Sequence, residues 1–348
     1  MFLIYHQDDI IYSLNKNTYS DDYYITWNDV VSIKENTIFD LPPKSSIYIA
    51  TTNRFNDHYD FKKVNFYPLS LLKSNLQKCV RRNKSDKAVK TAYQMINQNI
   101  SEFLRRLIII IVEDSIIHPD MLFCMWLYMA ITKGYTIQTY QVYKLLKIVY
   151  EITVCNCKDI IINNFEFILY KQSCKKKIIN AEEEIIDKLD KCCLSMLLRT
   201  LYGGMDGDMN MLKSNVKIWK NRILKNKIMW LNFLSYIWNY DKFKIDDYYF
   251  SNKDILIESI DFHSYGDTFL HKIMEIHTDL SQNDIKKSIW YFRSGVNIKT
   301  CICNKKNYLE PFSEEDENDE NDEKEKYTEI WNRIKIDVDR ISILFYKF

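Results

Sequence analysis

Apolar side chains recur at helical spacing from residue 69 to the C-terminus, and residues typical of helix ends separate the repeats. Ser85 and Ser101 stand at expected N-cap positions, each before an apolar repeat. Gly134 and Gly295 follow two further repeats, as helix-terminating glycines do. In residues 327–348, apolar residues spaced by three or four positions mark one face of a terminal helix. The pattern predicts a chain made mainly of helices.

The first 68 residues follow a different pattern. Three short runs are rich in aromatic and β-branched residues, as strands are, with aspartate, asparagine and proline around them. These runs are Phe2–Tyr5, Tyr23–Trp27 and Ser46–Thr52. We therefore expect a mainly α fold, a multi-helix bundle with a small N-terminal β-containing module over residues 1–68.

Glycine and proline are scarce, at 6 and 5 of 348 residues. Folds with many tight turns, such as propellers and β-sandwiches, need glycine at positive φ and are disfavoured. The sequence has neither G-x-G-x-x-G nor G-x-x-x-x-G-K-[ST], so it has no glycine-rich loop for the phosphates of a nucleotide cofactor. We expect no cofactor. Since no catalytic-triad signature is present either, a non-enzymatic protein is favoured.

Nine cysteines, several of them in apolar helical repeats, indicate reduced thiols. This predicts the cytoplasm, the nucleus or, for a viral protein, a viral factory. Residues 1–14 lack the basic start of a signal peptide, and the apolar runs 107–112 and 121–131 are too short to span a membrane. Cys155/Cys157 and Cys301/Cys303 are spaced too closely for an ordinary zinc knuckle, so neutral thiols are favoured over a metal site.

Two arginine pairs stand near the ends of neighbouring predicted helices: Arg81 and Arg82, preceded by Lys78, and Arg105 and Arg106. Guanidinium groups bind phosphate or carboxylate through paired hydrogen bonds. Two interpretations are open. The residues form a phosphate-contacting edge, or they pair internally with carboxylates such as those of residues 113 and 114, and internal pairing is slightly favoured.

The same stretch resembles the helical C-terminal region of the replication-associated recombination protein family, clamp-loader-like AAA+ proteins that include the Werner-helicase-interacting ATPase. The matching positions are Gln77-Lys78, Arg81, Asp86, Ala88, Met95, Arg105-Arg106-Leu107 and Glu113-Asp114. The match covers roughly 60 to 75 residues. The family's ATPase core normally precedes this region, whereas only about 70 residues precede it here, without Walker motifs. The resemblance implies a helical module for oligomerisation and for attachment to replication or repair proteins, without the ATPase.

The overall charge of +1 hides a segregated distribution. Residues 313–326 carry a net charge of −7, so the remainder carries +8, which is compatible with a nucleic-acid partner. We therefore predict five parts. They are the β module 1–68, a clamp-loader-like helical domain 69–200, a second helical domain 201–312, an acidic disordered linker 313–326 and a terminal helix 327–348.

Half of the glycines fall in one short segment, which contains Gly203, Gly204, Asp206, Gly207 and Asp208. In the structural interpretation, Gly203 adopts a left-handed C-cap and Asp208 caps the next helix. In the functional one, the two aspartates hold a divalent cation or position a ligand on exposed backbone amides. The structural interpretation is favoured.

Asp261 and His263 begin a segment that contains three of the six histidines. Together with Asp206 and Asp208, they could provide the ligands of a metal-dependent nuclease or hydrolase. The alternative is that these histidines have structural roles, which is favoured.

Basic and aromatic residues alternate over 285–300, where Lys286, Lys287 and Arg293 accompany Trp290 and Phe292. Such a stretch could contact phosphates and stack on bases, or could form an ordinary amphipathic helix.

Together with the arginine pairs, this stretch leads us to expect a non-catalytic accessory factor for DNA replication or repair. Candidate partners are DNA, replication or repair proteins and further copies of the chain. The competing hypotheses are the metal-dependent enzyme and a purely structural interaction protein. The overall composition resembles that of proteins from large DNA viruses with AT-rich genomes.

Overall fold

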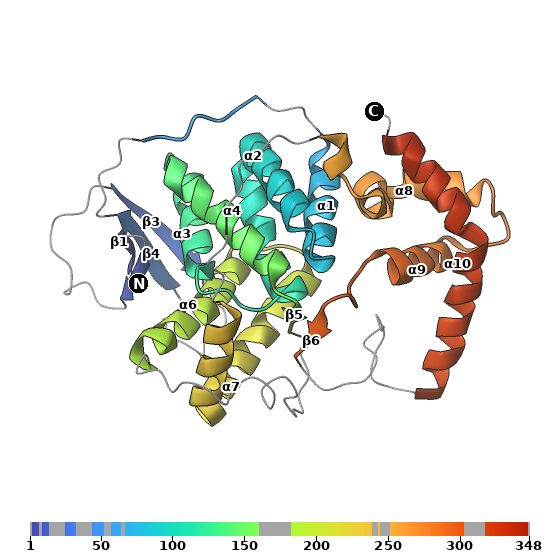
Figure 1. The fold of residues 1–348 in the computed structure, drawn as a ribbon. Helices are drawn as coiled ribbons and strands as arrows, with labels where there is room; N and C mark the ends of the chain where they lie inside the picture. The colour runs from blue at the N-terminus through green and yellow to red at the C-terminus, as the bar shows by residue number, and fades with distance from the viewer. Residues whose placement is uncertain are drawn as a thin grey trace.

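The computed structural model describes residues 2–6, 9–13, 25–32, 44–51, 57–63, 67–159, 182–238, 243, 251–302 and 317–346. The predicted fold class is confirmed, because the described chain is mainly helical and carries a small sheet at its N-terminus (Figure 1).

Four strands form the N-terminal sheet: β1 (Phe2–His6), β2 (Asp9–Ser13), β3 (Ile25–Ser32) and β4 (Lys44–Thr51). The strand order is β2-β1-β4-β3, in which β1 and β4 are parallel and the outer pairs are antiparallel. Of these, β2 lies outside the predicted runs. Ile10 is buried and Ile11 is exposed, so β2 alternates like a half-buried strand, but it is too short for the pattern to be distinctive.

The sheet packs against α3 (Met121–Thr132), the most deeply buried helix of the described chain. Every residue from 121 to 130 is buried, as expected for a helix that is apolar on all sides. The rings of Tyr5 and Trp126 are 5.1 Å apart, and the Trp126 indole donates a hydrogen bond to the Leu3 carbonyl at 3.3 Å. These contacts connect the N-terminal module to the helical body.

The helices around α3 form the main body of the protein. They are α1 (Leu69–Arg81), α2 (Ser85–Asp114), α4 (Thr139–Val154), α6 (Glu182–Leu201) and α7 (Asp206–Ile237). Helix α2 packs on α1, α3 and α4, while α6 packs on α3 and α7. The predicted domain boundary at residues 200–201 lies at the end of α6, so it separates two helices that pack together.

A break in α2 replaces the two separate helices predicted there. Asn99 has φ −160° and ψ 91°, and its side chain accepts a hydrogen bond from the Glu102 backbone N–H at 3.0 Å. Asn99 therefore caps the second half of α2 in the role expected for Ser101. The break fixes the direction of the half-helix that carries Arg105 and Arg106.

The C-terminal part of the described chain packs on the other side of α1. It contains the short 3-10 helices η2 (Asn252–Asp254) and η3 (Ile257–Ser259), followed by α8 (Phe262–Met274), α9 (Gln282–Arg293) and α10 (Glu317–Tyr346). Helix α8 contacts α1, and α10 packs along α8 and α9 (Figure 1). A two-strand parallel ladder joins β5 (Cys157–Lys158) to β6 (Thr300–Cys301), so the chain after α4 meets the chain after α9.

Helix α10 begins ten residues before the predicted terminal helix. Residues 317–326, predicted as part of a disordered linker, form its first turns. Carboxylates stabilise a helix N-terminus, and Lys326 at the end of this segment pairs with Asp284 of α9 at 2.9 Å. The acidic residues therefore belong to a helix that packs on α9.

The expected helix stops are confirmed, since Gly134 and Gly295 have φ of +94° and +75°. Alanine at position 134 is expected to lower the free energy of unfolding by about 1–2 kcal/mol, because a left-handed backbone strains an L-residue. Gly295→Ala is expected to cost a further ~1 kcal/mol, because its Cβ would lie 2.3 Å from Nη1 of Arg82, which must move. Urea unfolding of both variants checks this order, and equal losses would contradict it.

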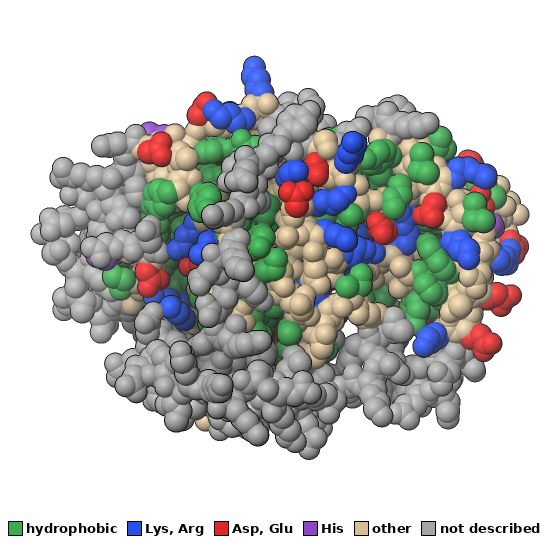
Figure 2. Space-filling view, in the orientation of Figure 1, with side chains coloured by type: hydrophobic (Ala, Val, Ile, Leu, Met, Phe, Trp, Pro, Cys, Tyr) green, Lys and Arg blue, Asp and Glu red, His purple; other side chains and the backbone are tan. Residues whose placement is uncertain are grey.

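The described surface is mixed in charge. On the face drawn in Figure 2, Lys and Arg side chains are interspersed with Asp, Glu and apolar residues instead of gathering into one basic surface. In the described ranges, no helix has both the length and the apolar character needed to cross a membrane.

Candidate functional site

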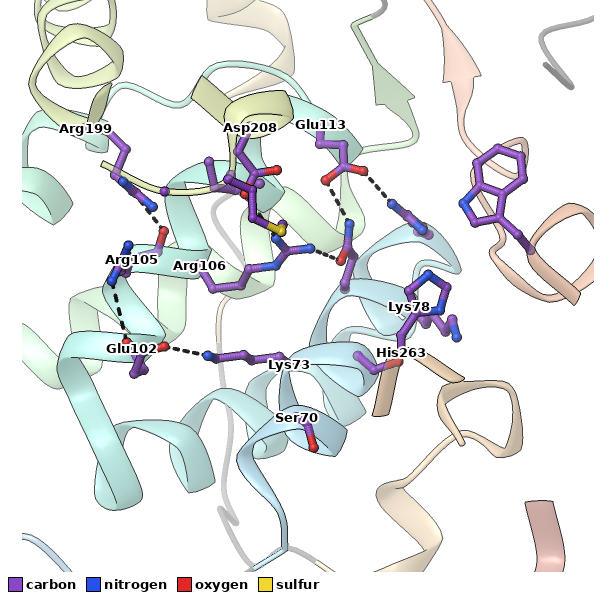
Figure 3. Close-up of a pocket in the computed structure, with 17 residues that line it drawn as sticks. Ser70, Lys73, Lys78, Glu102, Arg105, Arg106, Glu113, Arg199, Asp208 and His263 are labelled. Carbon is purple, nitrogen blue, oxygen red and sulfur yellow. Dashed lines mark hydrogen bonds and ion pairs between the residues drawn. The ribbon is translucent and has the colours of Figure 1, made fainter. Parts of the chain in front are cut away.

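A cleft of about 680 Å³ lies where α1, the second half of α2, the α6–α7 turn, the start of α8 and the last turns of α9 face one another (Figure 3). Six cationic and three acidic side chains line it: Lys73, Lys78, Arg81, Arg105, Arg106 and Arg199, with Glu102, Glu113 and Asp208. Elements from both predicted helical domains contribute. The cleft brings together four of the predicted basic residues and three residues of the other predicted motifs.

Two polar helix faces form the base of the cleft. On α1 the lining positions are 70, 73, 74, 77, 78 and 81, and on α2 they are 102, 105, 106, 109 and 113. Spacings of three and four residues place these side chains on one face of each helix. The opposite face of α1 buries Leu72, Leu76 and Val80, so the packing of the core turns the polar faces toward each other.

Arg81 holds the acidic pair at the end of α2. Its Nε lies 2.5 Å from Asp114 and its Nη2 lies 2.9 Å from Glu113, while Gln77 donates to both carboxylates at 2.8 and 2.9 Å. Burial opposes the charge on Arg81, but the two carboxylates raise its pKa. Burial and the neighbouring Asp114 raise the pKa of Glu113 to about 7. The internal-pairing interpretation therefore holds for Arg81. Its partners are the two carboxylates that were also candidate partners for Arg105 and Arg106.

Arg105 and Arg106 have weaker partners and face the cleft. Arg106 donates to the Gln77 side-chain oxygen and lies 3.7 Å from a carboxylate oxygen of Asp208. Arg105 lies 4.0 Å from Glu102 and donates to the Gly203 carbonyl at 3.4 Å, with 38% of its side chain exposed. These distances are long for ion pairs, so both guanidinium groups retain donors for a ligand.

Lys78 and Asp261 form a buried ion pair at the α8 side of the cleft, with 4% and 1% of their side chains exposed. Lys78 also donates to the Glu258 carbonyl at 2.5 Å. Asp261 caps α8 by accepting from the His263 backbone N–H at 2.8 Å, and its carboxylate lies 3.1 Å from Nδ1 of the same histidine. Burial lowers the pKa of Lys78 to about 8, while Lys78 and His263 hold the pKa of Asp261 below its usual range despite burial. This arrangement positions the His263 ring at the edge of the cleft.

The four residues of the predicted metal alternative do not meet. Asp206 is exposed in the first turn of α7, and Asp208 faces Arg106. Only Asp261 and His263 are neighbours, and the Asp261 carboxylate is already paired with Lys78. Across the described ranges, no three His, Cys, Asp or Glu residues form a group that could hold a metal ion. The structure therefore contradicts a metal site built from Asp206, Asp208, Asp261 and His263.

The glycine-rich segment forms the turn between α6 and α7. Gly203 has φ +71°, as the structural interpretation predicted. The predicted cap is wrong, however, because Met205 occupies the N-cap of α7 and both aspartates lie in its first turn, with Gly207 between them. Gly204 lines the cleft.

Four of the predicted basic residues do not line the cleft. Arg82 donates to the backbone carbonyls of Ser294 and Arg293, at 3.2 and 2.7 Å. Arg293 is buried and donates to the Ser342 hydroxyl at 2.9 Å, so it joins α9 to α10. Lys287 lies 3.8 Å from a carboxylate of α10, that of Glu323. These contacts give Arg82, Lys287 and Arg293 partners within the fold, and the binding role predicted for them stays a prediction. Lys286, next to Lys287 on α9, also lies outside the cleft.

Four charged residues of the cleft were absent from the predicted site: Lys73, Glu102, Glu113 and Arg199. Lys73 bonds to Glu102 at 2.5 Å, and Arg199 donates to the carbonyls of Arg105 and Gly203 at 3.2 and 2.6 Å. Lys73 could have been found from its spacing of four residues before Gln77 and eight before Arg81. Arg199 comes from a distant helix, and no local pattern in the sequence indicates it.

Cysteines 79, 124, 155, 157, 192 and 193 are free thiols. The β5–β6 ladder places Cys157 opposite Thr300 and next to Cys301, so members of the two Cys-x-Cys pairs come together; Cys303 lies outside the described residues. A hydrogen bond with Cys157 lowers the pKa of Cys155 to about 6.

No protein-family model, curated protein or solved structure matches the chain. The resemblance to the replication-associated recombination family therefore remains a prediction. The geometry and charge of the cleft are the basis for a proposed function.

Proposed function

We propose that the protein is a non-catalytic accessory factor of DNA replication or repair that binds nucleic acid in this cleft. The observation that supports binding is the excess of cations on the lining: six against three carboxylates, or four against three when the two cations paired with buried aspartates outside the lining are set aside. Asp114 neutralises Arg81 and Asp261 neutralises Lys78, and neither aspartate lines the cleft. The charge offered to a ligand therefore comes from Lys73, Arg105, Arg106 and Arg199.

Phosphate is the anion that suits this arrangement. Guanidinium forks bind phosphate oxygens bidentately, and a concave site strengthens each interaction by limiting the access of water. Nucleic acid presents such anions at regular spacing, and neutralising them releases bound counterions. The role in replication or repair rests on the resemblance of residues 77–114 described above.

Self-association is the second part of the proposal. Ile336, Ile343 and Leu344 are exposed on α10, and their spacing of seven and eight residues places them on one side of the helix. This side could pack against a second copy of the chain. Sedimentation equilibrium tests the proposal, and a strict monomer at high concentration would contradict it.

Nucleic-acid binding can be tested by fluorescence anisotropy with a labelled DNA oligonucleotide. We expect binding at low salt that weakens steadily as salt rises from about 50 to 200 mM. Replacing Arg105 and Arg106 together by glutamine should weaken binding about tenfold and reduce the salt dependence, because two phosphate contacts are lost.

The matched control replaces Arg333 and Arg340 of α10 by glutamine. Both are exposed, at 44% and 69%, and neither lines the cleft. The control variant should bind like the wild type. Absence of binding at low salt, or an equal loss in both variants, would contradict a cleft that binds nucleic acid and would favour a purely structural protein.

Glu113 makes this binding depend on pH. Its pKa is raised to about 7, and it faces Asp114, Arg81, Arg106 and Asp208. Below pH 7 Glu113 is largely protonated, so the cleft loses a negative charge and should bind DNA roughly three- to tenfold more tightly at pH 6 than at pH 8. Lys78, whose pKa is lowered to about 8, adds to this difference in the same direction. Glu113→Gln should therefore reduce the difference without abolishing it, whereas a difference that persists unchanged would contradict the assignment. His263→Gln is the control, since His263 also lines the cleft.

A further inference from the structure

One end of the cleft holds two guanidinium groups, those of Arg105 and Arg199, with little carboxylate charge beside them. Arg199 is buried, and its hydrogen bonds go to the backbone carbonyls of Arg105 and Gly203. No described carboxylate lies within ion-pair distance of Arg199. The carboxylate nearest to Arg105 is that of Glu102, at 4.0 Å, and Lys73 already holds it at 2.5 Å.

This end of the cleft is therefore short of negative charge. Burial lowers the pKa of Arg199, and the positive charge of Arg105 lowers it further. A bound anion would relieve both costs, because it supplies opposite charge to a desolvated cation. The fork of Arg105 is partly exposed and suits the paired oxygens of a phosphate.

The other side of the cleft is aromatic. His263 and Trp290 line it, and the His263 ring packs on Phe262 with centroids 4.0 Å apart. Trp290 is half-buried, and no hydrogen bond or ring contact joins it to another described side chain. An indole in a cleft with no aromatic partner offers a surface on which a nucleic-acid base can stack.

The arrangement of these groups matches the parts of a nucleotide. Figure 3 shows Arg105 and Arg199 together on one side of the cleft and His263 on the other, with Arg106 between them. A volume of about 680 Å³ is that of an ordinary small-ligand site, so it admits a few groups of a single strand but not a duplex.

We propose that the cleft holds a short segment of single-stranded DNA, with one phosphate on Arg105 and Arg199 and the base of a nearby nucleotide stacked on Trp290. This inference rests on the proposed nucleic-acid binding, and it adds the strand type and the position of phosphate and base. Lys73 and Arg106 lie on the path of the backbone between the two ends.

The test is a set of anisotropy competitions against a labelled single-stranded DNA. The competitors are an unlabelled single strand, the duplex of the same sequence, an abasic strand of equal length and thymidine monophosphate. We expect the single strand to compete at least tenfold better than the duplex. The abasic strand should be weaker by about 5- to 150-fold, because base stacking is lost.

Three variants assign the two ends of the cleft. Trp290→Leu should weaken binding of the normal strand about as much as base removal does, with no effect on the abasic strand, while Trp290→Phe should retain most of the affinity. Arg105→Gln should weaken the normal and abasic strands equally, because it removes a phosphate contact. Circular dichroism melting checks that each variant is folded. If Trp290→Leu does not fold, the comparison of the normal and abasic strands on the wild-type protein still tests base stacking.

The outcomes separate this inference from the proposed function. Equal binding of duplex and single strand, or an abasic strand that binds as well as the normal one, would overturn the inference and leave nucleic-acid binding intact. Thymidine monophosphate that competes as well as the strand would overturn the assignment to a strand. If no DNA binds at all, both proposals fail.

Discussion

Replacing Asp261 by alanine is expected to destabilise the protein by about 3–5 kcal/mol, because it leaves the ammonium group of Lys78 buried without its counter-charge. The two side chains are 1% and 4% exposed, so water cannot replace the lost partner. The substitution also removes the cap of α8, where Asp261 accepts from the His263 N–H at 2.8 Å. The remaining partner of Lys78 is the Glu258 carbonyl at 2.5 Å, a neutral group.

A double-mutant cycle identifies the source of this loss. The cycle uses Lys78→Met and Asp261→Asn: each alone should destabilise the protein, since each leaves a buried charge without its counter-charge, whereas the two together should lose less than the sum of these single variants. Urea unfolding measures the four free energies. Additive losses, or a loss below about 1 kcal/mol for Asp261→Ala, would show that the pair is not coupled as the structure indicates.

The pair also predicts how stability responds to acid. The pKa of Asp261 is depressed in the folded protein, where Lys78 and His263 stabilise its charged form despite burial. A carboxylate with a depressed pKa contributes stability that is present above its unfolded pKa of about 3.9 and is lost as pH falls further. This part of the acid sensitivity should be absent from the double variant.

Much of the helical architecture could be predicted because its signals are local. Gly295 ends the segment of α9 with a positive φ, as expected from the sequence, and Ser281 begins it by accepting from the Asp284 N–H at 3.1 Å, in the way an N-cap serine does. The break in α2 lies two residues before the expected position. Asn99 and Ser101 are both good capping residues, and packing selects between them. The parallel pairing of β1 with β4 joins distant segments, and no local pattern specifies it.

The candidate site was predictable only in part. The residues Arg81, Arg105 and Arg106 were found because arginine pairs at helix ends are visible in a sequence. Which of them pairs with Glu113 and Asp114 depends on how α1 packs against α2, and the structure gives both carboxylates to Arg81. The environment of Arg199 depends on bringing α6 next to α2, so its burial beside Arg105 could not be anticipated.

A second large effect is expected at Arg222 of α7, a residue with no distinguishing context in the sequence. Its guanidinium packs against both Trp219 and Trp230, 4.6 and 4.7 Å from the two ring centroids, which are themselves 5.1 Å apart. It also makes two hydrogen bonds to Asp159, one of them 3.1 Å long, and the side chains of this ion pair are 5% and 4% exposed. Arg222 thus joins α7 to the chain that follows α4, because its planar guanidinium packs on the two indole rings and also hydrogen-bonds to Asp159.

Arg222→Met should destabilise the protein by about 3–5 kcal/mol, because it removes the ion pair and both hydrogen bonds that Arg222 makes with the buried Asp159 carboxylate. Arg222→Lys should cost about 2 kcal/mol, since an ammonium group keeps the charge but loses the bidentate bonds and the planar stacking. Adding Asp159→Asn to Arg222→Met should recover part of the loss, because the buried charge is then removed. Arg340→Lys is the exposed control and should change stability by less than about 0.5 kcal/mol.

Thermal and urea unfolding measure these variants, and DNA binding below the melting temperature serves as the second measurement. Asp159, Trp219, Arg222 and Trp230 lie outside the cleft, so folded Arg222 variants should bind single-stranded DNA like the wild type. Equal stability of the Met and Lys variants would contradict the role given to the retained charge. A loss of DNA affinity in the folded Lys variant would show instead that the position of α7, which carries Asp208 into the cleft, is itself set by this ion pair.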